Sequence, residues 1–296
     1  MTTYPETETL PIHMVQPLKK QLLKWIGNKQ RMAHEIANLL PGDMRTYHEP
    51  FLGSGAVLGT LAPERAFGSD ALAPLMEIWS MLSSDTGTVV EWYRERRQHV
   101  VDVDSKKETY DRVKASYNAN PNGADLLFLS RTCYGGVVRF RRRDGHMSTP
   151  CGAHTPMPVE KFAKHVELWH ERTKGAAFRN LDFREAFQEA QAGDVIYCDP
   201  PYTDTQTILY GAQGFVLEDL ISEIDKAKSR GVRVALSIDG TKRSGLYEVV
   251  HHFPDGLFET EAAVTVGRSM LRRFQMVGQS LEDEVVHDRL LLTYAA

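Results

Sequence analysis

An aspartate, two prolines and a tyrosine stand in series directly after an apolar run that ends at Cys198. The run is typical of a buried β-strand, and ligands of open α/β sheets bind beyond the carboxyl ends of the strands. Two adjacent prolines fix φ and remove two N–H donors while keeping two carbonyl acceptors. Asp199, Pro200, Pro201 and Tyr202 therefore predict a stiff ledge for a planar ligand that carries an amino group, with the Tyr202 ring stacked on it. A rigid turn with a solvated aspartate is the alternative interpretation.

A second cluster, Glu49–Gly55, also follows a predicted strand and precedes a helical stretch. Its glycines Gly53 and Gly55 allow the backbone to approach a ligand closely. The cluster lacks the third glycine of the dinucleotide fingerprint and the lysine of a P-loop, so NAD and ATP are disfavoured. Asp70 ends the next strand, 17 positions after Gly53 and near the offset at which an acidic residue binds a ribose diol. A nucleoside cofactor without a pyrophosphate fits, and S-adenosylmethionine (AdoMet) is one.

A third segment is strongly basic. Residues 131–143 hold five arginines and no acidic residue, on a chain of formal net charge -4. Val137, Val138 and Phe140 favour a strand, and Asp144–Gly145 is a typical two-residue hairpin turn. Arginines on such a hairpin can contact guanine edges and phosphates in a DNA major groove, whereas the alternative is a solvated basic turn.

Strands and helices alternate on both sides of this basic segment. The predicted strands end at the clusters just described, and predicted helices follow them, which implies a mostly parallel α/β sheet. An antiparallel pair is expected to close the sheet near the end of the chain. The predicted strands are 46–49, 66–69, 176–179, 194–198, 232–238, 262–266 and 289–294, and the main predicted helices are 28–40, 183–191 and 217–230.

Composition excludes several classes of protein. With 296 residues, 42% hydrophobic and 25% charged, the chain is in the ordinary globular range. It has no run of 18 apolar residues, so no membrane span or membrane partner is expected, and the acidic, proline-containing N-terminus is unlike a secretory signal, which favours the cytoplasm. Three cysteines without CxxC spacing indicate free thiols and no metal site.

Taken together, the motifs resemble those of the Dam-like, α-type DNA N6-adenine methyltransferase family. The segment Leu23–Lys29 resembles the first motif of that family, Glu49–Gly55 its cofactor loop, and Tyr197–Tyr202 its catalytic motif. The resemblance runs from about residue 22 to the C-terminus. It implies a Rossmann-like, AdoMet-dependent methyltransferase sheet with an inserted helical and β-hairpin target-recognition domain.

The resemblance also implies roles for individual residues. The catalytic group is expected to be Asp199, Pro200, Pro201 and Tyr202, with Asp199 facing the cofactor as well. The cofactor-binding residues are expected to be Trp25, Lys29, Phe51, Gly53, Gly55, Asp70, Asp182 and Phe183, with Lys29 near the AdoMet carboxylate and Asp70 at the ribose. For Asp182 and Phe183, a helix N-cap followed by a core aromatic is the competing interpretation.

In the basic segment, the residues that match the family are Arg131, Tyr134, Gly136, Arg139 and Pro150. We expect Arg139 to read guanine and Arg141, Arg142 and Arg143 to contact phosphates. Val137, also expected at the DNA, and Gly135 depart from the family pattern, as does Asn28 in the first motif. A GATC-like target is therefore a hypothesis only.

The expected reaction transfers a methyl group from AdoMet to the N6 amine of a flipped-out adenine in duplex DNA. Methylation of cytosine N4, methylation of RNA adenine, a DNA-binding regulator with an inactive AdoMet site and a nicotinamide oxidoreductase are the alternatives. Double-stranded DNA is the expected partner, and a cognate restriction endonuclease could act separately. The expected organisation is a catalytic domain at 18–82 and 166–296, a target-recognition domain at 83–165 and an N-terminal arm at 1–17.

Overall fold

A mixed seven-stranded sheet is the centre of the fold in the computed structural model, which describes residues 15–25, 27–201, 215–239, 241–242, 247–248, 253–267 and 286–295. The strand order is β3-β2-β1-β4-β5-β9-β8, with β1 to β5 parallel and β9 antiparallel to both β5 and β8. The strands are β1 (Tyr47–Glu49), β2 (Ala66–Asp70), β3 (Ala176–Asn180), β4 (Val195–Cys198), β5 (Arg233–Asp239), β8 (Thr260–Gly267) and β9 (Val286–Leu292). A separate antiparallel pair joins β6 (Thr241–Lys242) and β7 (Tyr247–Glu248).

The strand order reverses between β1 and β4. The chain runs outward from β1 through β2 to β3, then returns to lay β4 on the other side of β1. A crevice forms at such a switch point, beyond the carboxyl ends of the two central strands, because their connections leave in opposite directions. The two predicted motifs follow these two strands, so the topology places them side by side.

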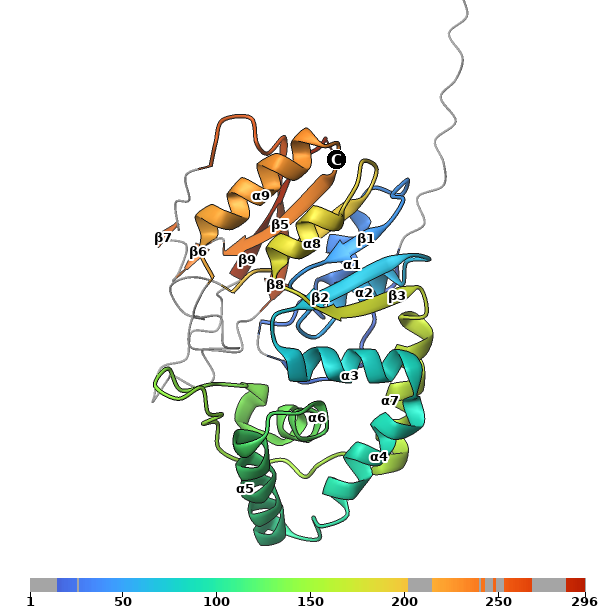
Figure 1. Cartoon of the computed structure of the whole chain (residues 1–296), viewed down its shortest axis with the longest axis vertical. Coiled ribbons are helices and arrows are strands. Elements are labelled where there is room, and N and C mark those ends of the chain that lie inside the picture. The colour runs from blue at the N-terminus through green and yellow to red at the C-terminus, as the bar shows by residue number, and fades with distance from the viewer. Residues whose placement is uncertain are drawn as a thin grey trace, which may run out of the picture.

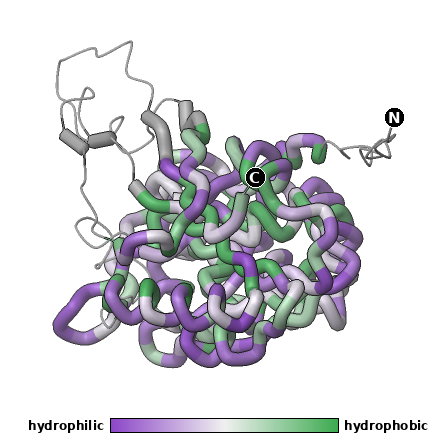
Figure 2. Tube along the Cα trace, turned by 90° about the horizontal axis from the view of Figure 1, so that it is seen from above, coloured by the Kyte–Doolittle hydropathy of each residue, from purple (hydrophilic) through white to green (hydrophobic). Residues whose placement is uncertain are grey.

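Helices cover both faces of the sheet (Figure 1). Successive residues of β4 alternate between the faces, since Val195 and Tyr197 join one apolar core while Ile196 and Cys198 join the other. The first core includes residues of α1 (Ala33–Asn38), α2 (Ala56–Leu61), α3 (Ala73–Ser84) and α7 (Val159–Arg172), and the second includes residues of α8 (Phe183–Glu189) and α9 (Leu217–Ser229). Figure 2 shows the hydrophobic segments mostly inside the trace and the hydrophilic ones around its periphery.

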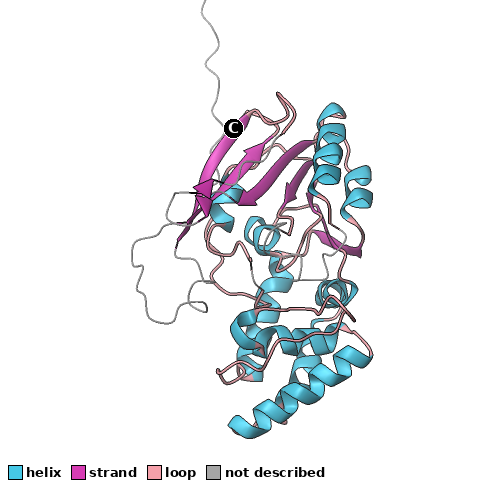
Figure 3. Cartoon of the chain, turned by 90° about the vertical axis from the view of Figure 1, so that its left-hand side faces the viewer, coloured by secondary structure: helices cyan, strands magenta, loops and turns pink. Residues whose placement is uncertain are grey.

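A helical part lies at one end of the sheet, as Figures 1 and 3 show. It contains α4 (Thr86–Arg97), α5 (Val103–Ala119), α6 (Gly123–Thr132) and the short 3-10 turn η1 (Tyr134–Gly136). Helix α5 begins at a capping box in which Asp102 and Ser105 satisfy each other's backbone N–H. Among the described residues, every helix is too short or too polar to cross a membrane.

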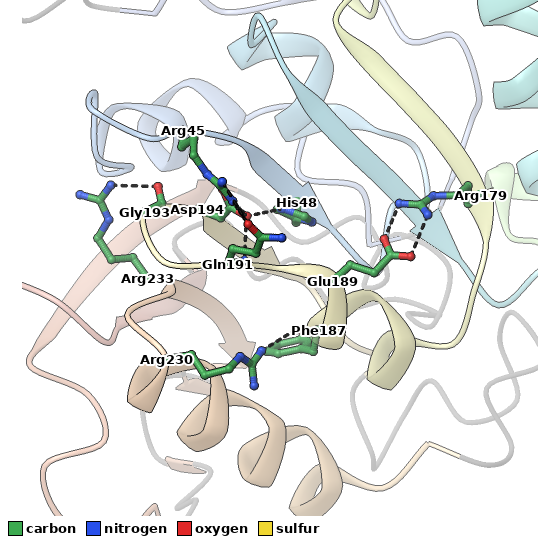
Figure 4. Close-up of polar contacts among 10 residues, drawn as sticks. All are labelled: Arg45, His48, Arg179, Phe187, Glu189, Gln191, Gly193, Asp194, Arg230 and Arg233. Atoms are coloured by element: carbon green, nitrogen blue, oxygen red, sulfur yellow. Dashed lines mark hydrogen bonds and ion pairs between the residues drawn. The ribbon is translucent and has the colours of Figure 1, made fainter.

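A polar network fixes the strands at the end opposite the crevice (Figure 4). The buried Asp194 carboxylate accepts from Arg45 Nε at 2.9 Å and lies 3.2 Å from His48 Nε2, so it joins the beginnings of β1 and β4. Burial lowers the pKa of His48 more than the neighbouring carboxylate raises it. Arg179 and Glu189 form a second ion pair beside it.

Most of the predicted elements are present. The closing antiparallel pair is confirmed as β8 and β9. The helix predicted from Asn28 begins only at Ala33, because Asn28 caps a turn: its side chain donates to the Trp25 carbonyl at 2.5 Å and accepts from Gln30 N at 3.2 Å. The predicted hairpin pairs through two isolated bridges, Cys133 with Cys151 and Phe140 with Met147, rather than a continuous ladder.

Candidate functional site

One cavity of about 370 Å³ opens beyond the carboxyl ends of β1 and β4. This volume is within the range of small-molecule sites, and such sites combine apolar walls with a few polar groups. Its lining includes most of the residues singled out in the sequence, namely Trp25, Lys29, Phe51, Gly53, Asp70, Asp182, Phe183, Asp199, Pro200 and Pro201. Tyr202 lies outside the described residues, as do positions 1–14 of the N-terminal arm.

The loop after β1 depends on glycine for its conformation. Gly53 and Gly55 have φ of +49° and +61°, in the left-handed region that side chains disfavour. A Cβ on Gly55 would also lie 2.9 Å from the Trp79 ring. The same Trp79 donates its indole N–H to the Gly53 carbonyl at 3.1 Å. Gly55 itself does not line the cavity, so its place in the site is to shape the loop.

Asp70 fastens this loop to the next strand. One carboxylate oxygen accepts from Gly53 N at 3.0 Å and the other accepts from Leu72 N at 3.0 Å. Burial raises the pKa of Asp70, while these backbone hydrogen bonds oppose the rise. Asp70 lines the cavity, so a carboxylate lone pair that the backbone does not use can accept from ligand hydroxyls.

The catalytic candidate Asp199 pairs with a lysine from the first motif. Lys29 Nζ lies 2.8 Å from Asp199 Oδ1, with side-chain exposures of 6% and 19%. The resemblance placed Lys29 near the carboxylate of AdoMet, and the structure joins it to the carboxylate of Asp199. This partly buried ion pair thus holds the first and last motifs together. Its contribution to stability depends on whether the other hydrogen-bonding groups of the two side chains also find partners.

Glu49 begins the predicted cofactor loop, although it was not among the predicted cofactor-binding residues. It ends β1, is 3% exposed and lines the cavity. Its Oε2 accepts from the Tyr47 hydroxyl at 2.7 Å and from Leu58 N at 2.9 Å. Burial raises the pKa of Glu49 to about 8, and the nearby Asp199 charge adds to the rise. The signal in the sequence was an acidic residue between a buried strand and the predicted cofactor loop.

Three aromatic rings form one wall of the cavity. Phe51 stacks on Phe183 with ring centroids 5.3 Å apart, and Phe215 meets both rings edge-on at 5.8 Å. Asp182 is the N-cap of α8, where it accepts from Arg184 N at 2.9 Å. Asp182 is therefore a helix cap, as the competing interpretation expected, and Phe183 lines the cavity, as the resemblance implied. Phe215 was missed, because its position follows a long segment without a motif.

Trp25 closes another part of the cavity. It is 7% exposed, and a Cβ on Gly53 would lie 3.3 Å from its indole nitrogen. The loop and the first motif thus approach each other closely because Gly53 has no side chain. Trp25 both lines the cavity and belongs to the apolar core.

The arginine hairpin, residues 133–151, presents basic side chains outside the cavity. Arg139 is exposed while its neighbours Val138 and Phe140 are buried, as alternation along a strand predicts. Arg142 and Pro150 are exposed too, whereas Val137 is half-buried. Arg141 and Arg143 are each ion-paired with Asp144, the acid of the predicted turn.

Tyr134 stands at the start of this hairpin with 46% of its surface exposed. The two glycines after it, Gly135 and Gly136, have φ of +66° and +69°. A Cβ on Gly136 would lie 3.0 Å from Cβ of Lys24, so the turn packs against the first motif. The hairpin base is therefore next to the segment that carries Trp25 and Lys29.

Arg131 differs from the other arginines of the basic segment. It lies on α6, is 7% exposed, and donates to the main-chain carbonyls of Gln21, at 3.3 Å, and Leu22. Its guanidinium also lies 5.1 Å from the Phe162 ring centroid. Burial lowers its pKa. The structure thus does not bring Arg131 to the surface with the hairpin arginines.

Comparison with known proteins gives independent evidence on the family of the chain. Residues 25–252 match the sequence profile of the D12 class N6 adenine-specific DNA methyltransferases. The chain is 28% identical over 234 residues to a DNA adenine methylase of Vibrio cholerae, a match that covers 74% of this chain and 82% of that protein. It is 28% identical over 244 residues to the retron Ec67 DNA adenine methylase of Escherichia coli, covering 78% and 82%. A type II methyltransferase of Methanocaldococcus jannaschii is 29% identical over 203 residues, covering 62% and 69%.

Proposed function

Because the chain belongs to the D12 class of N6 adenine-specific DNA methyltransferases, we propose that its cavity brings AdoMet and a flipped-out adenine together beside Asp199. One observation carries this proposal: Asp199 opens into the same cavity as the glycine loop and Asp70. An exocyclic amine on duplex DNA is paired inside the helix, so the base has to leave the stack to reach this cavity.

The cavity fits AdoMet by the chemistry of its walls. Asp70 has lone pairs left for ribose hydroxyls, and Phe51 and Phe183 offer ring faces for an adenine. Glu49 lines the same cavity and, once ionised, would accept from the ammonium group of the methionine part. When bound, AdoMet supplies an electrophilic methyl group.

The residues around Asp199 would prepare the adenine amine. The lone pair of this amine is delocalised into the adenine ring, which makes N6 a poor nucleophile. Acceptors that hold the N6 hydrogens stabilise the positive charge that develops on N6 in the transition state, as the nitrogen becomes tetrahedral. The Asp199 carboxylate and the Pro200 carbonyl are those acceptors, and the prolines keep the ledge rigid. Lys29 orients Asp199 through the 2.8 Å ion pair. Tyr202 is proposed to stack on the base, and proximity supplies much of the acceleration.

The arginine hairpin is the proposed DNA contact within the target-recognition region, residues 83–165. Arg139 would read guanine, Tyr134 and Val137 would face bases, and Arg141, Arg142 and Arg143 would approach phosphates. Arg131 is proposed to act indirectly, by fixing residues 21–22 before Trp25. The GATC-like target stays a hypothesis, and a separately acting restriction endonuclease is a possible partner by the resemblance alone.

Modification-sensitive sequencing of DNA from a methylation-deficient bacterium tests the proposal. The full chain should place N6-methyladenine in one short motif, and Asp199→Ala should abolish the modification while the purified protein still binds DNA. Asp219→Asn, an exposed carboxylate paired with Arg184, is the matched control and should leave the pattern unchanged. Normal modification by Asp199→Ala would refute the role of Asp199, and N4-methylcytosine would change the substrate.

A further inference from the structure

Two of the three cysteines meet at the base of the arginine hairpin. Cys133 follows α6, Cys151 follows Pro150, and the two residues are partners in an antiparallel bridge. Tyr134 N donates to the Pro150 carbonyl at 2.9 Å and Gly152 N donates to the Thr132 carbonyl at 2.8 Å. These bonds flank the cysteines on both sides, which identifies Cys133 and Cys151 as a non-hydrogen-bonded pair. In such pairs the Cα atoms are about 4.5 Å apart and the side chains point to the same side.

This separation lies within the range that a disulfide spans, which is roughly 4.4–6.8 Å between Cα atoms. Gly152 permits the close approach, because a Cβ there would lie 2.8 Å from the Cys133 carbonyl oxygen. A bridge of this type therefore places two cysteines within the range of Cα separations that a disulfide spans.

Both sides of the pair are supported by packed helices. Cys133 N donates to Leu129 O of α6 at 2.8 Å. On the other side, α5 holds the chain around Cys151, since the Tyr110 hydroxyl donates to Thr149 O at 2.8 Å and Lys106 Nζ donates to Ala153 O at 2.8 Å. The cysteines are thus preorganised by two helices, which reduces the entropy lost on forming a bond between them.

We propose that Cys133 and Cys151 form a dithiol site that is oxidised to an intramolecular disulfide by low-molecular-weight disulfides. Cys151 is the attacking thiol because it is partly exposed, whereas Cys133 is buried. The Cys151 thiolate attacks one sulfur of the oxidant, forms a mixed disulfide and releases one thiol. The Cys133 thiolate then attacks Cys151 Sγ, closes the protein disulfide and releases the second thiol.

The electrostatic surroundings agree with this order of events. Burial raises the pKa of both thiols, to about 12 for Cys133 and by less for Cys151. Lys106 and Lys107 oppose the rise at Cys151, because nearby positive charge favours the thiolate. Lys24 does the same at Cys133.

The third cysteine serves as an internal reference. Cys198 ends β4, is fully buried and belongs to the core on the other face of the sheet. It should stay reduced while the other two react. The bond would close residues 134–150, the segment that carries the exposed arginines, into a covalent loop. The oxidation itself is independent of DNA, so it is tested on the protein alone.

The test uses the reduced full chain, without DNA, incubated with excess oxidised glutathione, then denatured in the presence of an alkylating agent and digested with trypsin without reductant. The number of free thiols should fall from three to one, and the tryptic peptides 132–139 and 144–161 should appear linked. Cys133→Ser should instead carry glutathione on Cys151, and Cys151→Ser should keep both remaining thiols free.

Three results would overturn the proposal. The first is a linkage that involves Cys198. The second is a wild-type protein that carries glutathione on Cys151 without the peptide linkage, since the oxidant would then reach the site and the geometry would fail. The third is a wild-type protein and a Cys133→Ser variant that both keep all their thiols free, since the site would then not accept this class of oxidant.

Discussion

Glu49→Gln tests the electrostatics of the cavity by a change of one atom. Both hydrogen bonds to the side chain, from the Tyr47 hydroxyl and from Leu58 N, end on the same oxygen, Oε2. A glutamine whose carbonyl oxygen takes that position keeps both of them. The substitution therefore removes the ionisable group and preserves the packing and the hydrogen bonds.

The pKa of Glu49 gives the size and sign of the effect. It rises from 4.5 to about 8 on folding, so between these values the native protein holds a proton that the unfolded chain has released. The free energy of unfolding must then fall as pH rises through this window. At 1.36 kcal/mol per pKa unit, the loss from this group between pH 5.5 and 7.5 is about 3 kcal/mol. Glu49→Gln lacks this term, so the difference in the free energy of unfolding between the variant and the wild type should grow by about that amount from pH 5.5 to pH 7.5, in favour of the variant.

Urea denaturation of the ligand-free protein at several pH values, followed by tryptophan fluorescence, measures this difference. Other groups, such as His48 with its lowered pKa, also titrate in the window, but they contribute equally to both proteins. Only the difference between the two pH profiles reports Glu49. Parallel profiles would refute the buried, protonated state of Glu49.

The same variant should bind AdoMet more weakly. A hydrogen bond between charged groups is worth about 1.5–3 kcal/mol, so loss of the Glu49 carboxylate should raise the Kd for AdoMet by roughly 10- to 100-fold. Isothermal titration calorimetry measures this change. A variant that is more stable and binds AdoMet as well as the wild type would remove Glu49 from the proposed site.

Gly55→Ala should lower the free energy of unfolding more than Gly145→Ala, because both have positive φ but only Gly55 has the Trp79 ring within 4 Å. The left-handed backbone costs an alanine roughly 1–2 kcal/mol at either position, and overpacking against Trp79 adds about 1–3 kcal/mol at Gly55. Urea denaturation measures both losses. Equal losses for the two variants would contradict the clash. Arg139→Ala should cost about 1–3 kcal/mol of binding to the cognate duplex and relax the sequence preference, whereas Arg142→Ala should weaken all duplexes alike and reduce the salt slope by about 1. Fluorescence anisotropy at several salt concentrations separates them, and identical behaviour would contradict the assigned contacts.

Local sequence predicted the sheet well because its strands are short apolar runs with a turn or a charged residue at each end. The runs 194–198 and 232–238 correspond to β4 and β5, and the cofactor loop and Asp70 line one cavity, as their place after neighbouring strands implied. This part of the site follows from topology, because parallel strands end at one edge.

The residues that the sequence did not reveal are those whose role depends on tertiary packing. Arg131 counted toward a basic run, but helix α6 turns it inward, where it donates hydrogen bonds to the Gln21 and Leu22 carbonyls. Nothing in the local sequence of Glu49 indicates that the folded chain buries its carboxyl group. Phe215 joins Phe51 and Phe183 only when α9 docks beside α8. Periodicity within one element contains no information on such contacts.

The anchoring of residues 20–22 limits how enzymes of this family can be recombined. Arg131 of α6 binds the carbonyls of Gln21 and Leu22, while Trp169 of α7 donates to Lys20 O at 2.8 Å. Grafting residues 83–165 of a relative onto this sheet would leave the Gln21 and Leu22 carbonyls dependent on where the relative's helix places the arginine at position 131. A chimera that exchanges residues 83–165 should therefore exchange residues 18–24 with them, because the two segments are separate in the sequence but are joined by these hydrogen bonds.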